Sequence, residues 1–388
     1  MATSAVASRE TSVPSLAADV RRFGVFNAHG CFACGSCTVV CDLASDTASF
    51  PRRPMQSVVL GLKESVWHDL DPWLCHDCGD CSTTCPREAE PRQSMATLRR
   101  YLSGQYDWTG LSARVLRSLA FELAALGAVA LMVLALIIVY HLTVAKLDLA
   151  TFRSTAMGME HMFPRIQYFT VAVFLIPAFF MISNIIRMHR LTMRRAAIPL
   201  HFYAAEAAAL LVNTVAHVEI LKCAARDRRK KWTMHWMMAA GCVVLAGIKL
   251  FFLRWFQTDR IVPLYDPQRW VGYLAAAGIL LGAGEILAAW FRERKPQHAS
   301  SRPSDLMLPA LLAGTALSGI AVHVCRYVGL SLTAHYLYAL HLMIAVPMLM
   351  VEVPFGHWAH MIYRPLALYF AAVKDRAEAE RKEKAVAA

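Results

Sequence analysis

The sequence holds CFACGSCTVVC at residues 31–41 and CHDCGDCSTTCP at residues 75–86. Each stretch has the spacing C-x2-C-x2-C-x3-C, which is typical of bacterial ferredoxins that bind a pair of [4Fe–4S] clusters. In two-cluster ferredoxins the fourth cysteine of each run ligates the other cluster. The spacing therefore predicts two clusters whose ligand sets exchange their last member.

Each predicted cluster takes three thiols from one run and one from the other. The first set is Cys31, Cys34, Cys37 and Cys85. The second set is Cys75, Cys78, Cys81 and Cys41. Gly35 and Gly79 are expected to take a positive φ where the chain folds back around each cluster.

Disulfides and zinc are the alternative uses of these cysteines. Disulfides are disfavoured because the domain is expected to lie in the reducing cytoplasm. Zinc sites are normally built from pairs of cysteines, so each run would have two thiols too many. The remaining cysteines, Cys223, Cys242 and Cys325, are expected to be small apolar packing residues.

The rest of the chain indicates a membrane domain. The 388 residues are 57% hydrophobic, and the long apolar stretches lie after residue 112. Each stretch has about 20 residues or more, enough for a helix to cross a hydrocarbon core of about 30 Å. Backbone in lipid must satisfy its own hydrogen bonds, so we expect helices. The expected spans lie near 117–144, 166–187, 234–256, 271–291, 306–328 and 334–362.

These patterns predict a mostly α-helical protein with a ferredoxin-like two-cluster domain followed by a six-helix transmembrane cytochrome b bundle. The expected domains are a soluble domain at 1–112, a membrane domain at 113–370 and a charged tail at 371–388. The stretch 197–223 has an apolar face but also holds polar residues. We expect it to lie at the inner membrane interface.

The charge pattern predicts the orientation. No apolar segment typical of a secretory signal precedes the first cysteine run. Basic residues gather in the loops on one side of the spans, which the positive-inside rule places in the cytoplasm. We therefore expect a multi-pass protein of the cytoplasmic membrane with the iron–sulfur domain and both termini inside. The net charge of +12 then reflects topology and anionic lipid contact rather than nucleic-acid binding.

Histidines within the spans are the candidate haem ligands, because ionisable residues in a bilayer are functional candidates by default. Two axial histidines commonly hold haem b. The topology places His235 and His360 at one level near the inner face. It places His323 and His341 at a second level near the outer face. Two haems b are therefore expected, with His341 and His360 about 28 Å apart along one helix.

Two histidines compete for these positions. His217 is an alternative to His235 at the inner haem, and His141 is an alternative ligand at the outer haem. Quinone chemistry also needs a proton carrier near the ring. The candidates, none of them assigned, are Glu352 and His357 at the inner side and Glu160 and His161 at the outer side.

With these motifs established, the chain resembles the C subunit of the quinone-interacting membrane-bound oxidoreductase. The resemblance rests on the two cysteine runs, on FPRRP between them, and on the final segment HLMIAVPMLMVEVPFGHWAHMIYRPLALYF. The soluble half is similar to the C subunit of heterodisulfide reductase. The membrane half is similar to the cytochrome b subunits of heterodisulfide and nitrate reductases.

The resemblance implies two [4Fe–4S] clusters, two haems b and a menaquinone site. It also implies partner subunits that carry flavin and iron–sulfur clusters, similar to the A subunit of heterodisulfide reductase, and an exchange of electrons with adenylylsulfate reductase in sulfur metabolism. In the gamma chain of nitrate reductase one helix carries two haem histidines at nearly the spacing of His341 and His360. A second helix there carries another pair, but Leu245 stands at that offset from His235, so His323 is preferred.

The leading hypothesis is a subunit of a quinone-linked oxidoreductase that carries electrons between a cytoplasmic flavin and iron–sulfur partner and menaquinone. The runner-up is a membrane subunit of a heterodisulfide reductase-type complex. A non-redox membrane anchor is a third hypothesis, and it predicts no haem. Histidines at two matched depths disfavour the anchor.

Overall fold

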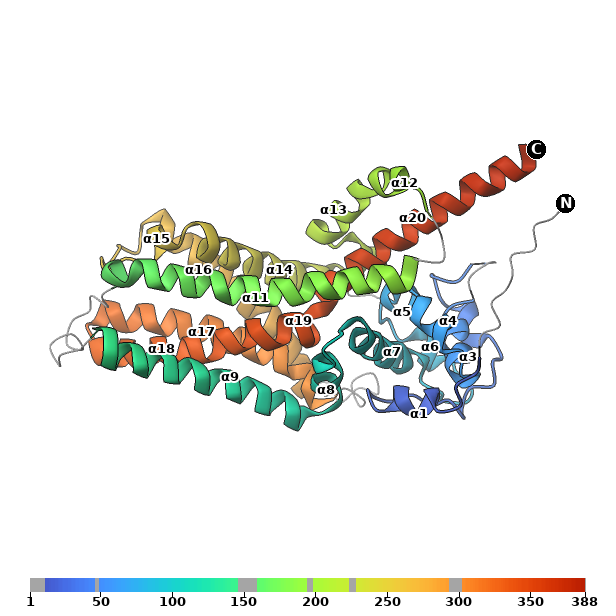
Figure 1. Ribbon diagram of the computed structural model, residues 1–388, viewed down its shortest axis with the longest axis horizontal. Coiled ribbons are helices and arrows are strands. Elements are labelled where there is room, and N and C mark those ends of the chain that lie inside the picture. The colour runs from blue at the N-terminus through green and yellow to red at the C-terminus, as the bar shows by residue number, and fades with distance from the viewer. Residues whose placement is uncertain are drawn as a thin grey trace. The chain divides into compact units, whose positions relative to one another are not determined.

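The structure is a computed structural model that describes residues 11–45, 49–145, 159–193, 198–222, 228–292 and 302–387. Within these ranges every regular element is a helix and no strand occurs (Figure 1). The prediction of a mostly α-helical protein is confirmed. The chain forms two compact units. Unit 1 is Met1–Ala113, Asn184–Ala225 and His360–Ala388, and unit 2 is Arg114–Ser183 and Arg226–Ala359.

Unit 1 is built from short helices around the two cysteine runs. Its helices before residue 113 are α1 (Leu16–Arg21), α2 (Ser36–Val39), α3 (Arg52–Val59), α4 (Lys63–His68), α5 (Asp71–Leu74), α6 (Asp80–Thr83) and α7 (Pro91–Tyr106). Gly35 precedes α2 with φ 87°, and Gly79 precedes α6 with φ 96°. The expected positive φ at both glycines is confirmed. α2 packs against α6, which brings the two cysteine runs together.

The later segments of unit 1 complete it. They are α12 (Leu200–Ala205), α13 (Ala207–Ala216), the 3-10 helix η3 (Val218–Lys222) and α20 (His360–Ala387). α20 packs against α5, α12 and α13. The stretch expected at the membrane interface therefore forms two short helices and a 3-10 turn. Its apolar part, Leu200–Ala216, is shorter than the helices that could cross a bilayer.

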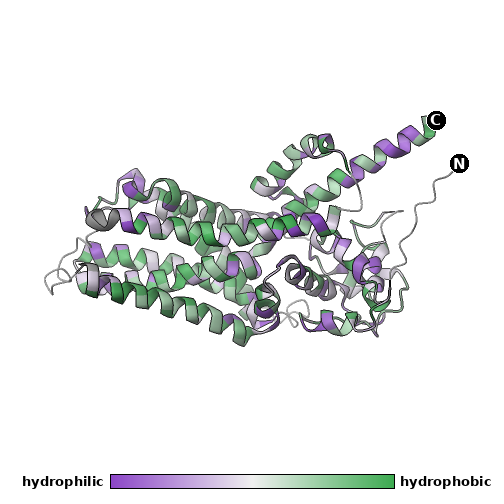
Figure 2. Cartoon of the chain, viewed as in Figure 1, coloured by the Kyte–Doolittle hydropathy of each residue, from purple (hydrophilic) through white to green (hydrophobic). Residues whose placement is uncertain are grey.

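Unit 2 contains long apolar helices, which Figure 2 shows as mostly green ribbons. They are α9 (Leu119–Tyr140), α14 (Arg228–Phe251), α16 (Pro267–Arg292), α17 (Met307–Val328) and α18 (Ser331–Pro347). Short elements join or extend them: η1 (His141–Ala145), α15 (Leu253–Phe256), η4 (Pro303–Leu306), η5 (Met348–Glu352), α19 (Val353–Phe355) and η6 (His357–Ala359). α8 (Leu111–Arg117) and α11 (Met159–Met193) belong partly to each unit.

Six helices are long and apolar enough to cross a membrane. They are Leu119–Thr143, Pro164–Met193, Arg228–Phe251, Pro267–Arg292, Pro303–Val328 and Ser331–Phe355. Six helices with the length and composition expected for membrane spans are thus present. α14 packs on α16, α16 on α17, α17 on α18, and α18 on α9, which gives the bundle a continuous chain of helix contacts.

The last span differs from its prediction. His341 and His360 were expected on one continuous helix, but α18 ends at Pro347 and α20 begins at His360. Pro354 follows a π-helical turn, and Gly356 is extended with φ −106° and ψ −152°. Prolines lack the amide donor that a helix interior needs, and glycine favours a break. The single-helix ladder of two haems is therefore wrong as a description of the backbone.

Candidate functional site: cysteine cavities and a histidine-lined membrane cavity

One cavity in unit 1 is lined by the cysteines that the spacing assigns to the first cluster. They are Cys31, Cys34, Cys37 and Cys85. Two N–H groups point at these sulfurs. The Ala89 amide donates to Cys85 Sγ at 3.4 Å, and Gln56 Nε2 lies 3.6 Å from Cys31 Sγ. Hydrogen bonds of this kind stabilise thiolates and tune a cluster's reduction potential.

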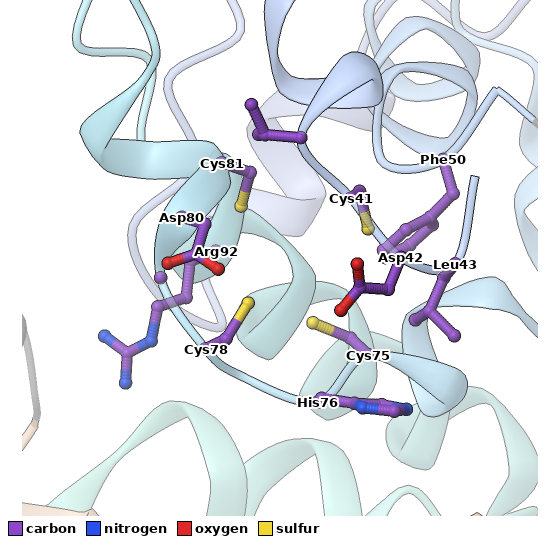
Figure 3. A pocket seen from close by; sticks show the side chains of 12 residues that line it. Cys41, Asp42, Leu43, Phe50, Cys75, His76, Cys78, Asp80, Cys81 and Arg92 are labelled. Atoms are coloured by element: carbon purple, nitrogen blue, oxygen red, sulfur yellow. The ribbon is translucent and has the colours of Figure 1, made fainter. Parts of the chain in front are cut away.

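A second cavity in unit 1 is lined by the other predicted set: Cys41, Cys75, Cys78 and Cys81. In Figure 3 their four sulfur atoms point toward the middle of the cavity, with Arg92 at its edge. The Asp77 amide donates to Cys75 Sγ at 3.4 Å. Arg92 donates to the Asp77 carboxylate at 2.8 Å and to its backbone carbonyl at 3.3 Å, which holds this loop in place.

The chemistry of these thiols fits iron. Burial raises the pKa of the Cys81 thiol and of the Cys75 thiol, because a thiolate loses its hydration there. Burial is also the main reason that the pKa of the Cys37 thiol and of the Cys41 thiol is raised. Metal ligands must be deprotonated, and a bound metal supplies the positive charge that keeps buried thiolates ionised. The four thiols of each cavity can therefore hold one cluster together.

Three aromatic rings connect the second cysteine run to α20 within unit 1. Trp73 lies in α5, two residues before Cys75, and its indole N–H donates to the Tyr106 hydroxyl at 3.2 Å. Tyr363 packs edge-on against Trp73 at 5.4 Å and against Tyr106 at 5.3 Å between ring centroids. All three side chains are fully buried. The contact places the first turn of α20, where His360 lies, beside the Cys75 loop.

The inner haem candidates fall in different units. His217 directly follows α13 as its C-cap with φ 48°, and it shares unit 1 with His360, the first residue of α20. α13 packs on α20. His235 lies on α14 in unit 2. Within unit 1, therefore, His217 is the candidate that the structure groups with His360.

The outer candidates share one cavity. His323 on α17 and His341 on α18 both line a cavity of about 280 Å³ in unit 2. Its walls are mostly apolar, and Gly319 leaves room beside His341, because a Cβ there would lie 3.3 Å from the imidazole Cε1. Three cations also line it: Lys249, Arg269 and Arg326. An apolar cavity with a few convergent polar groups is the usual form of a cofactor or ligand site.

His341 is oriented as a metal ligand should be. Its Nδ1 lies 3.0 Å from the Ser318 hydroxyl, which itself donates to the Gly314 carbonyl at 2.7 Å. The hydroxyl oxygen therefore accepts from Nδ1–H, and Nε2 keeps its lone pair. A supporting hydrogen bond of this type fixes the tautomer of ligating histidines.

His323 has a different environment. Arg269 Nη1 lies 3.1 Å from its Nδ1, and the Tyr273 hydroxyl lies 3.5 Å from the same atom. A guanidinium only donates, so it occupies the Nδ1 lone pair and leaves the hydrogen of a neutral ring on Nε2. Ligation of a haem by His323 requires Arg269 to release this ring. His341 can ligate a haem through Nε2 without such a change.

Several functional contacts were not anticipated from the sequence. Neither Ser318 nor Arg269 stands out in the sequence. A serine within an apolar span is common, and so is an arginine near the end of one. Glu122, at the start of the first span, is fully buried and was a missed signal, because a carboxylate there is a functional candidate by default. The side chains of Glu160 and His161 lie outside the described residues, as does Cys223.

Comparisons with known proteins agree with the cysteine cavities. Residues 27–89 match the family model of the 4Fe–4S dicluster domain. A protein of Archaeoglobus profundus that is named as similar to the C subunit of heterodisulfide reductase is 30% identical over 112 residues, which are 28% of this chain and 60% of that protein. The second iron–sulfur C subunit of CoB–CoM heterodisulfide reductase from Methanocaldococcus jannaschii is 36% identical over 69 residues, 18% of this chain and 37% of that protein.

The matches cover less than a third of this chain and less than two thirds of either relative's length. No solved structure matches the chain. The chain therefore combines a 4Fe–4S dicluster domain, similar to the iron–sulfur C subunits of heterodisulfide reductases, with six helices long enough to span a membrane.

Proposed function

We propose that this chain is the membrane electron-transfer subunit of a quinone-linked oxidoreductase. Electrons would pass between a cytoplasmic flavin and iron–sulfur partner and the menaquinone pool through two [4Fe–4S] clusters and two haems b. The partner would be a complex coupled to adenylylsulfate reductase, as the resemblance implies. The observation that carries the proposal is the shared membrane cavity of His323 and His341 in a chain that also holds a dicluster domain.

The residues have separate roles in this proposal. The two sets of four cysteines would hold the clusters, and His341, oriented by Ser318, would ligate the outer haem. His323 is the proposed second ligand, once Arg269 turns away from its Nδ1. Arg269, Arg326 and Lys249 would balance acidic groups of a bound cofactor in the cavity. When bound, a haem supplies a one-electron carrier at the depth of the apolar bundle.

The entry to the membrane carriers is proposed on α20. His360 begins this helix, and Tyr363 one turn later contacts Trp73 beside Cys75. His360 and His217, which share unit 1, would ligate the inner haem. This arrangement would let the second cluster and the inner haem exchange electrons across buried aromatic groups.

The test is a pyridine haemochrome assay with iron and acid-labile sulfide on the full chain, purified anaerobically in detergent. Two haems b, together with iron and sulfide for two clusters, support the proposal. Reduction of the haem bands by a menaquinol analogue supports the quinone link. Clusters without haem would overturn the cytochrome part, and haems that a quinol does not reduce would overturn the quinone part.

A heterodisulfide reductase-type complex is the second candidate, and the names of the similar proteins favour it. The two candidates differ in the partner. Anaerobic co-purification followed by mass spectrometry separates them, because a disulfide-reducing complex must contain a catalytic subunit that acts on disulfides. Recovery of such a subunit favours this candidate, and recovery of flavin subunits with adenylylsulfate reductase favours the first.

A further inference from the structure

Two glutamates and a histidine from distant segments of unit 2 converge on one point. Glu122 lies in the first turn of α9, Glu352 ends η5 and His357 begins η6. His357 Nδ1 lies 3.8 Å from Glu122 Oε1 and 3.9 Å from Glu352 Oε2. One ligand atom from each residue lies within 4.8 Å of the other two. We propose that Glu122, Glu352 and His357 bind a divalent transition-metal ion.

The burial of the two carboxylates calls for a positively charged partner. Both glutamate side chains are 0% exposed. Among the residues that the structure describes, no hydrogen bond reaches either carboxylate oxygen of Glu122 or Oε1 of Glu352. Glu352 Oε2 accepts one bond, from the His357 amide at 3.0 Å. Burying a carboxylate without a donor or cation is costly, so two adjacent ones require compensation.

The histidine is arranged to ligate through Nδ1. Its other nitrogen, Nε2, lies 3.3 Å from Asp305 Oδ1. The two atoms do not form a hydrogen bond as they lie, but a proton on Nε2 would face this carboxylate and leave the Nδ1 lone pair facing the two glutamates. A carboxylate on the second nitrogen is the usual support of a metal-bound imidazole, because it fixes the tautomer and raises the basicity of the ligand.

The backbone is shaped around this point. Gly356 lies between η5 and η6 in an extended conformation, and a Cβ there would overlap Glu352 Oε2. Glycine therefore lets the chain turn closely around the carboxylate. Asp305 lies in η4, directly before α17. A metal ion would hold the beginning of α9 against the end of the α18–η5 run. Through Asp305 it would also fix the beginning of α17.

The distances and the donor types fit a transition metal. Ligand atoms of a tetrahedral site with bonds of about 2.0–2.1 Å lie roughly 3.3 Å apart, so an inward shift of roughly half an ångström per atom closes the site. Carboxylates with one imidazole suit Zn²⁺, Mn²⁺ or Fe²⁺ better than soft thiophilic ions. The site does not depend on the proposed electron route.

Arg302, three residues before Asp305, is a cation in the same part of unit 2. Arg302 donates to the backbone carbonyls of Leu116 and Arg117, both at 3.2 Å. A proton shared by the two glutamates is the competing explanation of their burial. The two explanations predict opposite effects of Glu→Gln changes, because an amide imitates a protonated carboxyl group but is a poor metal ligand.

The experiment uses the full chain, purified anaerobically in detergent. Elemental analysis measures zinc, manganese and iron, and iron is corrected for acid-labile sulfide and haem. The same protein is then treated with a chelator and titrated with Mn²⁺, whose free form is followed by its EPR signal. One metal equivalent bound by wild type and lost in Glu122→Gln supports the site. Glu285→Gln is the matched control, because Glu285 is an exposed partner of Lys230 elsewhere in unit 2.

A second variant covers the case in which Glu122→Gln fails to fold. Asp305→Asn keeps the three ligands and is expected to weaken Mn²⁺ binding by about 10–100-fold, as loss of an outer-shell partner usually does. The proposal is overturned if wild type holds no metal and binds Mn²⁺ no better than the glutamine variant. It is also overturned if Glu122→Gln folds with a raised melting temperature and unchanged metal content, the result expected for a shared proton.

Discussion

Trp73 and Tyr363 pack edge to face with ring centroids 5.4 Å apart, although 290 positions separate them along the sequence of 388 residues. The contact joins a residue that lies two positions before Cys75 to a residue three positions after His360. It ties the last helix of the chain to the iron–sulfur module within one compact unit. Both residues are fully buried, so the contact is part of the core of unit 1.

Removal of the Tyr363 ring is expected to destabilise unit 1. Tyr363→Ala should cost about 3–5 kcal/mol, the usual range for deleting a buried aromatic side chain. The measurement is the thermal unfolding midpoint of the purified chain, followed by loss of the iron–sulfur absorbance. Tyr363→Phe keeps the ring and should stay close to wild type. Trp108→Ala removes an exposed aromatic residue of the same unit and should have little effect. An equal loss in Tyr363→Ala and Trp108→Ala would contradict this role for the contact.

The exchange of the fourth cysteine can be tested by double variants. Cys41 and Cys75 line the same cavity, so Cys41→Ser with Cys75→Ser should remove one cluster, no more than either change alone. Cys37 lines the other cavity, so Cys37→Ser with Cys75→Ser should remove both. Iron, acid-labile sulfide and EPR of the reduced protein measure the outcome.

Cys242→Ser, on α14 and outside both cavities, is the control for the cysteine series and should keep both clusters. Only the Cys41 and Cys75 pair would behave differently if each cluster were held by a single run. In that case the Cys41 and Cys75 pair would lose two clusters, and the Cys37 and Cys75 pair would still lose two.

The proposed outer haem site predicts a specific loss of haem. His341→Ala should remove one haem b, while His335→Ala should keep both, because the imidazole of His335 bonds to the Ser331 carbonyl at 2.8 Å on the same helix. The pyridine haemochrome assay measures both. Ser318→Ala should keep the haem and shift its midpoint potential, because it removes the hydroxyl group that orients His341. Full haem content in His341→Ala would exclude this residue as a ligand.

Asp69 predicts a pH dependence of stability. Burial, reinforced by the nearby charge of Asp71, raises the pKa of Asp69 to about 7, although Arg53 lies 3.3 Å away. The ordinary value is 3.8, so between these two values the folded chain binds the proton more tightly than the unfolded chain. The free energy of unfolding therefore falls as the pH rises from about 4 to about 7.

Asp69→Asn should flatten this part of the profile, because an amide does not ionise. Denaturant unfolding of the full chain at a series of pH values measures the slope. Asp19→Asn changes a carboxylate that forms an exposed ion pair with Arg22, and it should leave the slope as in wild type. A profile for Asp69→Asn that is as steep as that of wild type would show that Asp69 does not control this transition.

The sequence predicts local features well because each depends on a short pattern. The cysteine spacing and the two glycines describe loops of about ten residues, and Gly35 and Gly79 take the φ that those loops need. The membrane helices follow from runs of apolar residues, since one helix satisfies its own backbone in lipid. The interruption near Gly356 was missed, because the apolar character continues across it while the backbone does not.

The sequence by itself determined the iron–sulfur motifs and the helical, membrane-spanning character of the rest, because these depend on neighbouring residues. Only the tertiary structure decided which distant side chains meet: Ser318 with His341, Arg269 with His323, and Glu122 with Glu352 and His357. The physical reason is that such contacts depend on the rotation and depth of each helix, which the packing of several helices sets together. A periodic apolar pattern states which residues avoid water, but it does not state which partner each polar residue will find.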